Sequence, residues 1–245
     1  MRKFIYIIVL VFLFSCNKEK KQKNSSVESI DSLTIYLNIA NNENSSSIQK
    51  KRNYQKALNI VINQKNDSIK RINLFNISLG FYKAKDWEFF NKTSNILEKS
   101  ALEKKDTLSL AKVYRYKAGY NKGIGVYDSA FFYYLKSEKF YKELKDNLNL
   151  SVVLVNKSIV QYYANDYLGA DRSATQAYRV LRNLEDKQKL YEVFTMMGII
   201  SNELKDYDKA IEYYNKALKI VIDNQLETSE HQKATCLNNI GYAFN

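Results

Sequence analysis

The sequence predicts an all-α solenoid in which a helix–turn–helix unit recurs about every 40 residues. The 245-residue chain contains no proline and only 7 glycines, which argues against a turn-rich β sandwich and favours long helices. Its apolar residues follow the spacing of amphipathic helices. A bulky aromatic residue also returns at a constant interval, at Trp87, Tyr127, Tyr167 and Tyr207.

The chain begins with an apolar segment that predicts an export signal. Arg2 and Lys3 precede an apolar run of 11 residues, Phe4–Phe14. A helix of this length rises about 16 Å, roughly half the hydrocarbon core of a bilayer, so the run is too short for a membrane span. We therefore expect residues 1–15 to be a signal peptide.

The end of this segment, Leu13-Phe14-Ser15-Cys16, resembles the lipobox of bacterial lipoproteins. The resemblance implies that the chain is cut before Cys16 and that the Cys16 sulfur is acylated. Several acyl chains would anchor the protein firmly, because each buried CH₂ contributes about 0.8 kcal/mol. Phe14 is bulkier than the small residue usual at its position, and a secretory signal with an incidental cysteine is the alternative.

Residues 16–27 are predicted to be the lipidated cysteine and a flexible basic tether. This stretch is polar and shows no helical or strand periodicity. Residues 1–23 carry six basic side chains and one acidic one, so that five of the twelve net positive charges belong to the signal and tether. Anionic lipid near the tether accounts for this excess, and export argues against nucleic acid as the partner.

Residues 28–245 are predicted to form the repeat domain, with about five units followed by a single C-terminal helix. Three more series share the 40-residue interval: Ser78, Ala118, Ser158 and Gly198; Phe90, Ala130, Ala170 and Ala210; and Asp106, Asp146 and Asp186. Asp86, Asp166 and Asp206 come just before the second helices of their units. A carboxylate there caps free N–H groups and contributes about 1 kcal/mol.

The unit Tyr191–Ile222 resembles the tetratricopeptide repeat. Its two helices carry Phe194-x2-Met197-Gly198-x2-Ser201 and Asp206-Tyr207-x2-Ala210-x3-Tyr214-x2-Ala217. The resemblance implies a right-handed superhelix, in which Gly198 and Ala210 let two helices approach and Tyr207 closes the gap between them. It also implies binding of proteins or peptides.

Other units match this pattern less well. Lys117 and Lys157 stand where an apolar residue is expected before the small residue. Phe90 replaces the usual alanine, so the helices of its unit should lie further apart. Upstream, residues 30–40 and the segment Asn53-Tyr54-x2-Ala57 predict the two helices of a first unit.

In this repeat family the first helix of each unit lines an inner groove. By register, the resemblance assigns the groove to Phe75, Tyr82, Lys112, Arg115, Lys122, Val155, Ile159, Tyr162, Tyr163, Asn202 and Asn238. The three cations among them lie in one unit and would bind carboxylates, while tyrosines of the next unit would supply contact area. Ordinary solvated lysines and half-buried tyrosines are the alternative.

Few side chains are suited to catalysis or metal binding. The chain has 1 His and, apart from Cys16, a single cysteine, and His231 with Glu227 has no third ligand nearby in the sequence. Gly123-Ile124-Gly125 lacks the strand and loop of a nucleotide site. No nucleophile–base pair stands out. We therefore expect no enzymatic activity, no metal and no cofactor.

These observations favour a non-catalytic scaffold that is lipid-anchored in the bacterial cell envelope, faces the periplasm and binds a protein or peptide. A second hypothesis is the sensory region of a truncated signalling protein, either a histidine kinase or a DNA-binding regulator, because similar exported arrays precede such domains. A third is a glycan-binding lipoprotein, because tyrosines stack on sugars.

Overall fold

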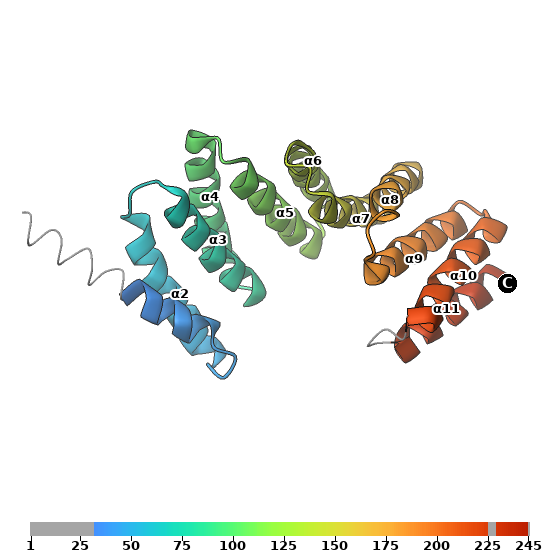
Figure 1. Ribbon diagram of the computed structural model, residues 1–245, viewed down its shortest axis with the longest axis horizontal. Helices are drawn as coiled ribbons and strands as arrows, with labels where there is room; N and C mark the ends of the chain where they lie inside the picture. Colours follow the sequence, from blue (N-terminus) through green and yellow to red (C-terminus); the bar gives the residue numbers. More distant parts are fainter. Residues whose placement is uncertain (1–31, 225–228, 245) are drawn as a thin grey trace, which may run out of the picture. The chain divides into compact units, whose positions relative to one another are not determined.

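The computed structural model describes residues 32–224 and 229–244, and every regular element in these ranges is an α-helix (Figure 1). The predicted signal peptide, Cys16 and the tether lie outside the described residues. None of the described helices is both long and apolar enough to span a membrane. The chain forms two compact units, residues 1–96 (unit 1) and residues 97–245 (unit 2), which meet within helix α4.

Unit 1 contains a helix at residues 32–41, two further helices and the start of α4. The bounds of the labelled helices are α2 Ser47–Ile62, α3 Ser68–Lys83 and α4 Trp87–Lys104. The helix at 32–41 and α2 confirm the helices predicted for the first unit of the repeat. Phe90 is fully buried and makes edge contacts with Tyr82 and Trp87, so an aromatic cluster fills this crossing.

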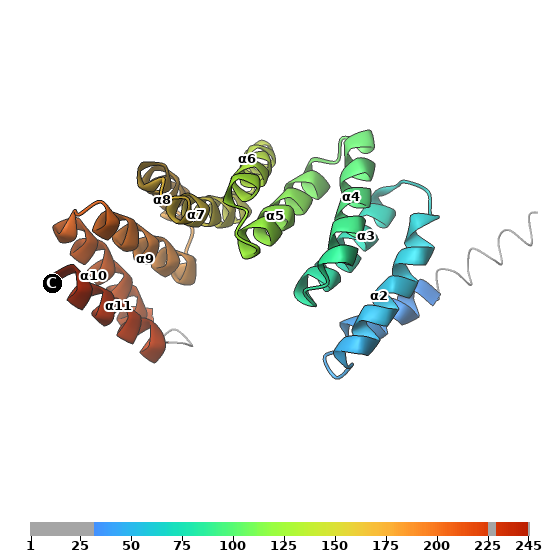
Figure 2. The same cartoon turned by 180° about the vertical axis from the view of Figure 1, so that it is seen from behind.

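Unit 2 continues the series of adjacent helices through the rest of the described chain (Figures 1 and 2). Their bounds are α5 Thr107–Gly123, α6 Tyr127–Glu143, α7 Asn147–Tyr163, α8 Tyr167–Leu181, α9 Lys187–Glu203, α10 Tyr207–Asn224 and α11 Ser229–Phe244. Each of α5, α7 and α9 packs mainly on the helix that follows it, and it also contacts the next first helix along the chain. The predicted helix pairs are therefore present.

The turns between helices explain the length of the repeat. The N–H of Lys145 donates to Lys142 O at 3.1 Å and that of Asp146 to Tyr141 O at 3.1 Å, a Schellman motif that closes α6. The Asp146 side chain then accepts from the N–H of Asn149 at 3.0 Å and caps α7. One residue therefore ends one helix and begins the next. Helices of 17 residues and turns of three make 20, so a helix pair occupies 40.

The same turn recurs through both units. It requires a left-handed residue, and the residues with positive φ are Lys85, Lys105, Gly125, Lys145, Asn165 and Lys205. The side chains of Asp86, Asp166 and Asp206 each accept a hydrogen bond from the N–H three residues later, which confirms the predicted caps. The aspartates of the 106–146–186 series play the same part at the first helices.

Small residues allow close helix contacts, as predicted. Ala210 is fully buried, and a Cβ added to Gly198 would lie 2.4 Å from Cε1 of Tyr214. The ring that lies against Gly198 therefore belongs to Tyr214. Tyr207, expected to close this gap, is instead 46% exposed, because it stands at the first position of α10 and points away from the crossing.

The two lysines that interrupt the repeat pattern form buried ion pairs. Lys117 of α5 pairs with Glu98 of α4, and Lys157 of α7 pairs with Glu138 of α6 at 2.6 Å. Both pairs join a second helix to the following first helix, and they are themselves 40 residues apart. The equivalent positions are apolar one unit earlier (Leu58, Ile77) and one unit later (Tyr178, Met197). Each lysine is accommodated because a carboxylate faces it.

Candidate functional site

The surface formed by α5, α7, α9 and α11 of unit 2, here called the first-helix face, contains the polar contacts most suited to binding. Two of them join α5 to α7. The Arg115 guanidinium donates from Nη1 to Oδ1 of Asn149 at 2.8 Å. One helical turn and a half further on, Lys122 Nζ donates to Oδ1 of Asn156 at 2.7 Å.

Both asparagines are themselves held in place. Asn149 donates from Nδ2 to Oδ2 of the cap Asp146 at 2.7 Å, and Asn156 donates from Nδ2 to Val152 O at 2.8 Å. Their Oδ1 atoms are therefore turned toward the cations of α5. Burial lowers the pKa of Lys122. These cations are half-buried and oriented before any ligand arrives, which reduces the conformational entropy lost on binding.

Similar polar contacts join the later first helices. The Tyr162 hydroxyl of α7 donates to Oε1 of Glu203 on α9 at 3.0 Å. Gln232 of α11 donates from Nε2 to Oε1 of Gln188 on α9 at 3.1 Å. Successive first helices are thus connected by side-chain hydrogen bonds across the whole of this face.

Tyrosines gather at the C-terminal end of α7. Tyr163 is 56% exposed and stacks on Tyr127, with ring centroids 5.6 Å apart and an interplanar angle of 11°. Tyr162 contacts both Tyr163 and Tyr167. Burial and the hydrogen bond to Glu203 raise the pKa of Tyr162 to about 12, so its hydroxyl stays protonated at neutral pH. The rings offer a rigid apolar surface with hydroxyl donors at its edge.

The residues assigned to the groove from the sequence are placed differently from one another. Half-buried in unit 2 are Lys112, Arg115, Lys122, Ile159, Tyr162 and Asn202, while Tyr163 and Asn238 are exposed. Val155 is 8% exposed and belongs to the core. Phe75 and Tyr82 are half-buried in unit 1.

Sequence reasoning missed the partners of the groove cations. Arg115 pairs with Asn149 and Lys122 with Asn156, and both pairs are separated by 34 residues. That shared offset was present in the sequence, but it differs from the 40-residue repeat and so was not looked for. Tyr116, whose ring lies 5.0 Å from the Arg115 guanidinium carbon, was also missed.

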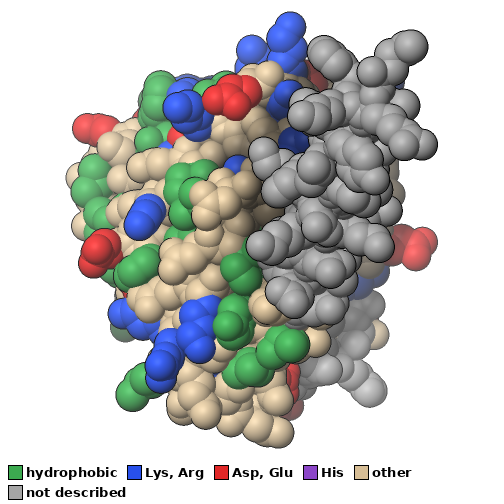
Figure 3. Space-filling view, turned by 90° about the vertical axis from the view of Figure 1, so that its left-hand side faces the viewer, with side chains coloured by type: hydrophobic (Ala, Val, Ile, Leu, Met, Phe, Trp, Pro, Cys, Tyr) green, Lys and Arg blue, Asp and Glu red, His purple; other side chains and the backbone are tan. Residues whose placement is uncertain are grey.

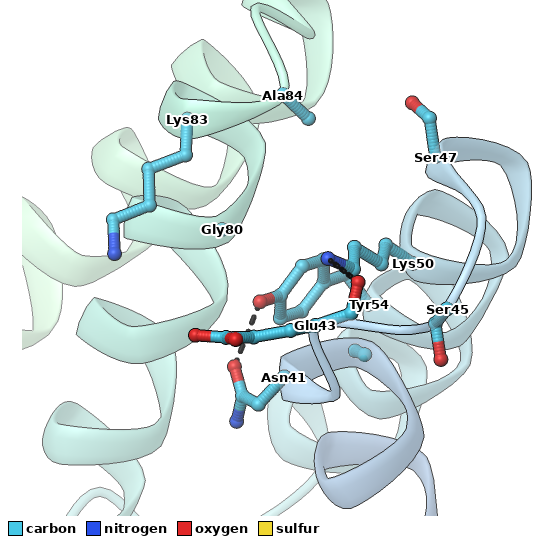
Figure 4. Close-up of a pocket in the computed structure, with 10 residues that line it drawn as sticks. Asn41, Glu43, Ser45, Ser47, Lys50, Tyr54, Gly80, Lys83 and Ala84 are labelled. Carbon is cyan, nitrogen blue, oxygen red and sulfur yellow. Dashed lines mark hydrogen bonds between the residues drawn. The ribbon is translucent and has the colours of Figure 1, made fainter.

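Unit 1 contains a separate cavity of about 430 Å³, here called the unit 1 cavity (Figure 4). It lies between the loop 42–46, the first two turns of α2 and the last turn of α3. Its lining residues are Ala40, Asn41, Glu43, Ser45, Ser47, Lys50, Tyr54, Gly80, Lys83 and Ala84. The sequence gave no indication of this cavity, because a loop of irregular backbone forms one wall.

The described surface shows no extended region of one charge in the view of Figure 3, where Lys and Arg side chains stand singly or in small groups among apolar and uncharged areas. Within the described residues no group of three His, Cys, Asp or Glu side chains is placed to hold a metal ion. Cys236 is fully buried, and burial raises the pKa of its thiol to about 11. It is the small buried side chain that the sequence predicts.

Three solved structures are similar to this chain. Aspartyl phosphate phosphatase F from Bacillus subtilis has a TM-score of 0.72 at 16% identity, over 92% of this chain and 62% of that one. BtubC (BKLC) from P. vanneervenii has a TM-score of 0.69 at 15% identity, over 82% and 84% of the two chains. A STAND signal-transduction ATPase with a tetratricopeptide repeat sensor, from Pyrococcus horikoshii, has a TM-score of 0.68 at 13% identity, over 81% and 31%.

At such identities the likeness shows the fold alone. No protein-family model and no curated protein matches the sequence. The described chain is an all-α helical-repeat protein of the tetratricopeptide type, and the fold class predicted from the 40-residue interval is confirmed.

Proposed function

We propose that this protein is a non-catalytic scaffold that binds a protein or peptide partner on the first-helix face of unit 2. The observation that carries the proposal is the pair of oriented, half-buried cations on α5, Arg115 and Lys122, each held by an asparagine of α7. A guanidinium and an ammonium held in this way favour carboxylate groups on the partner.

The neighbouring side chains support the same proposal. The tyrosines at the end of α7 add rigid aromatic area, and side chains of this kind contribute much of the binding energy at protein interfaces. Exposed apolar side chains alternate with polar ones, and the described residues show no constellation suited to covalent chemistry. An acidic peptide segment is therefore the partner that this surface fits best.

Charge reversal tests the proposal. Lys112→Glu and Arg115→Glu in the full-length chain should abolish capture of the partner that the unmodified protein enriches from envelope extracts. Lys219→Glu is the matched control, because Lys219 is an exposed cation on α10, outside the first-helix face. Capture that survives both reversals would refute this assignment of the site.

A lipid anchor at Cys16 is the second part of the proposal. The lipobox-like junction supports it, together with the basic stretch that follows. Cys16→Ser should move the protein from the membrane fraction to the soluble fraction and remove the mass of the acyl chains. Cys236→Ala is the control, because Cys236 is buried within the repeat domain. Unchanged membrane association of Cys16→Ser would contradict lipidation.

A further inference from the structure

The unit 1 cavity has walls of opposite charge. The loop contributes the Glu43 carboxylate, and the last turn of α3 contributes the Lys83 ammonium. Figure 4 shows the Glu43 side chain reaching from the loop toward the α3 wall, on which Lys83 stands. Among the ion pairs of the described residues, none involves either of these two groups. Both charges are therefore available to a ligand.

A rigid floor lies between these walls. The Tyr54 ring packs against Gly80, where an added Cβ would come within 2.2 Å of Cζ. The Tyr54 hydroxyl donates to Oδ1 of Asn41 at 2.8 Å. Lys50 Nζ donates to the backbone oxygen of Glu43 at 3.3 Å and so attaches the loop to α2. The shape of the cavity is thus set by packing and hydrogen bonds that need no ligand.

The loop is also fixed where it enters α2. The Ser46 side chain accepts from the N–H of Gln49, and the Gln49 side chain accepts from the N–H of Ser46, a complete capping box. Ser45 Oγ donates to Ile39 O at 2.7 Å. These contacts place Glu43 on a short, anchored loop rather than on a free end.

We propose that the unit 1 cavity binds a small zwitterion, a free α-amino acid or a short peptide, with its ammonium group at Glu43 and its carboxylate at Lys83. A simple anion would be repelled by Glu43, and a simple cation would meet the charges of Lys50 and Lys83. Only a ligand with both charges satisfies all three groups. The volume of about 430 Å³ lies within the usual range for small-ligand sites and accommodates a tripeptide.

Calorimetric titration of the full-length chain with trialanine, N-acetyl-trialanine and trialanine amide tests both charges. Trialanine should bind, and removal of either terminal charge should weaken binding about tenfold or more, since each charge-assisted contact is lost separately. Alanine and acetate complete the series. Alanine binding as well as trialanine would identify a free amino acid as the ligand class, and weaker alanine binding would identify a peptide.

Variants assign each charge to its partner. Glu43→Gln should weaken trialanine binding but leave N-acetyl-trialanine unaffected, because the lost contact is the one to the ligand amine. Lys83→Gln should do the same for trialanine amide. Both positions are exposed, so folding should be retained and is checked by circular dichroism. Glu88→Gln and Lys92→Gln, at exposed charges of α4 outside the cavity, should change nothing.

Two results would overturn the proposal. One is the absence of heat when trialanine and alanine are added at millimolar concentration. The other is acetate binding as tightly as trialanine, which would indicate an anion site. The variants of this test lie in unit 1 and those that test the first-helix face lie in unit 2, so failure of one proposal is distinguishable from failure of the other.

Discussion

Replacing Glu138 by leucine should destabilise unit 2 far more than replacing its partner Lys157 by methionine. Glu138 accepts hydrogen bonds from both Lys157 and Lys142, each at 2.6 Å. The side chains of Glu138 and Lys157 are each 9% exposed, whereas that of Lys142 is 55% exposed. The two variants therefore leave different charges behind.

The structure sets the size of each effect. Glu138→Leu leaves a buried ammonium with no carboxylate, a situation that costs about 3–5 kcal/mol. Lys157→Met leaves the carboxylate paired with Lys142, so the loss should be only about 1–2 kcal/mol. The double variant leaves no buried charge. Because replacing a whole buried pair by apolar residues is often neutral or favourable, it should be at least as stable as Glu138→Leu plus about 3 kcal/mol.

Urea and thermal unfolding followed by circular dichroism measure these differences. A loss of 3–5 kcal/mol corresponds to a fall in Tm of about 6–20 °C for a chain of this size. Equal losses in the two single variants would refute the reasoning, because they would show that Lys142 does not compensate the carboxylate. A double variant no more stable than Glu138→Leu would refute it equally.

The same pair should make stability depend on pH. Burial alone would raise the pKa of Glu138, but the hydrogen bonds from Lys142 and Lys157 outweigh it and hold the pKa below the ordinary value of 4.5. A lowered pKa means that the unfolded chain binds the proton more readily. The stabilisation is present above pH 4.5 and is lost as the pH falls through the lowered value. The double variant should therefore lose less stability in acid than the unmodified protein.

Three further predictions concern the repeat itself, all measured by thermal unfolding. Ala210→Leu should destabilise by about 1–3 kcal/mol, because the fully buried crossing has no room for the larger side chain, and no loss would contradict the helix register. Asp146→Ala should cost about 1 kcal/mol by removing the cap of α7, with the exposed Asp128 as the control position. Lys145→Gly should stabilise by about 0.5–1 kcal/mol by relieving a left-handed lysine, whereas Lys139→Gly within α6 should destabilise.

The repeat could be predicted from the sequence because its cause is local. Each turn needs a residue that ends one helix and caps the next, and the aspartates at 86, 106, 146, 166 and 206 mark these points. Small residues such as Ala210 and Gly198 mark the crossings. The left-handed residue was not predictable, because lysine occupies most of these positions and has no preference for that conformation.

The ion pairs and the candidate sites depend on contacts between helices, which are harder to predict. Lys117 and Lys157 looked like defects because the pattern describes one helix at a time, whereas their partners stand 19 residues earlier on the preceding helix. The same reason hid Asn149 and Asn156, which belong to the next unit. The unit 1 cavity depends on the path of an irregular loop, for which periodicity carries no information.

The buried pairs have a consequence for how the helices assemble. Helices of similar length and pattern stacked side by side risk packing on the wrong neighbour, because each offers a similar apolar surface. Glu98 with Lys117 and Glu138 with Lys157 distinguish two interfaces from those that carry Leu58 with Ile77 or Tyr178 with Met197. A shift by one unit would bury Lys157 against Tyr178 or Glu138 against Met197, each an unpaired charge. We infer that the pairs favour the correct order of packing, so the double variant, although stable, should refold with more misassembled or dimeric species on size exclusion.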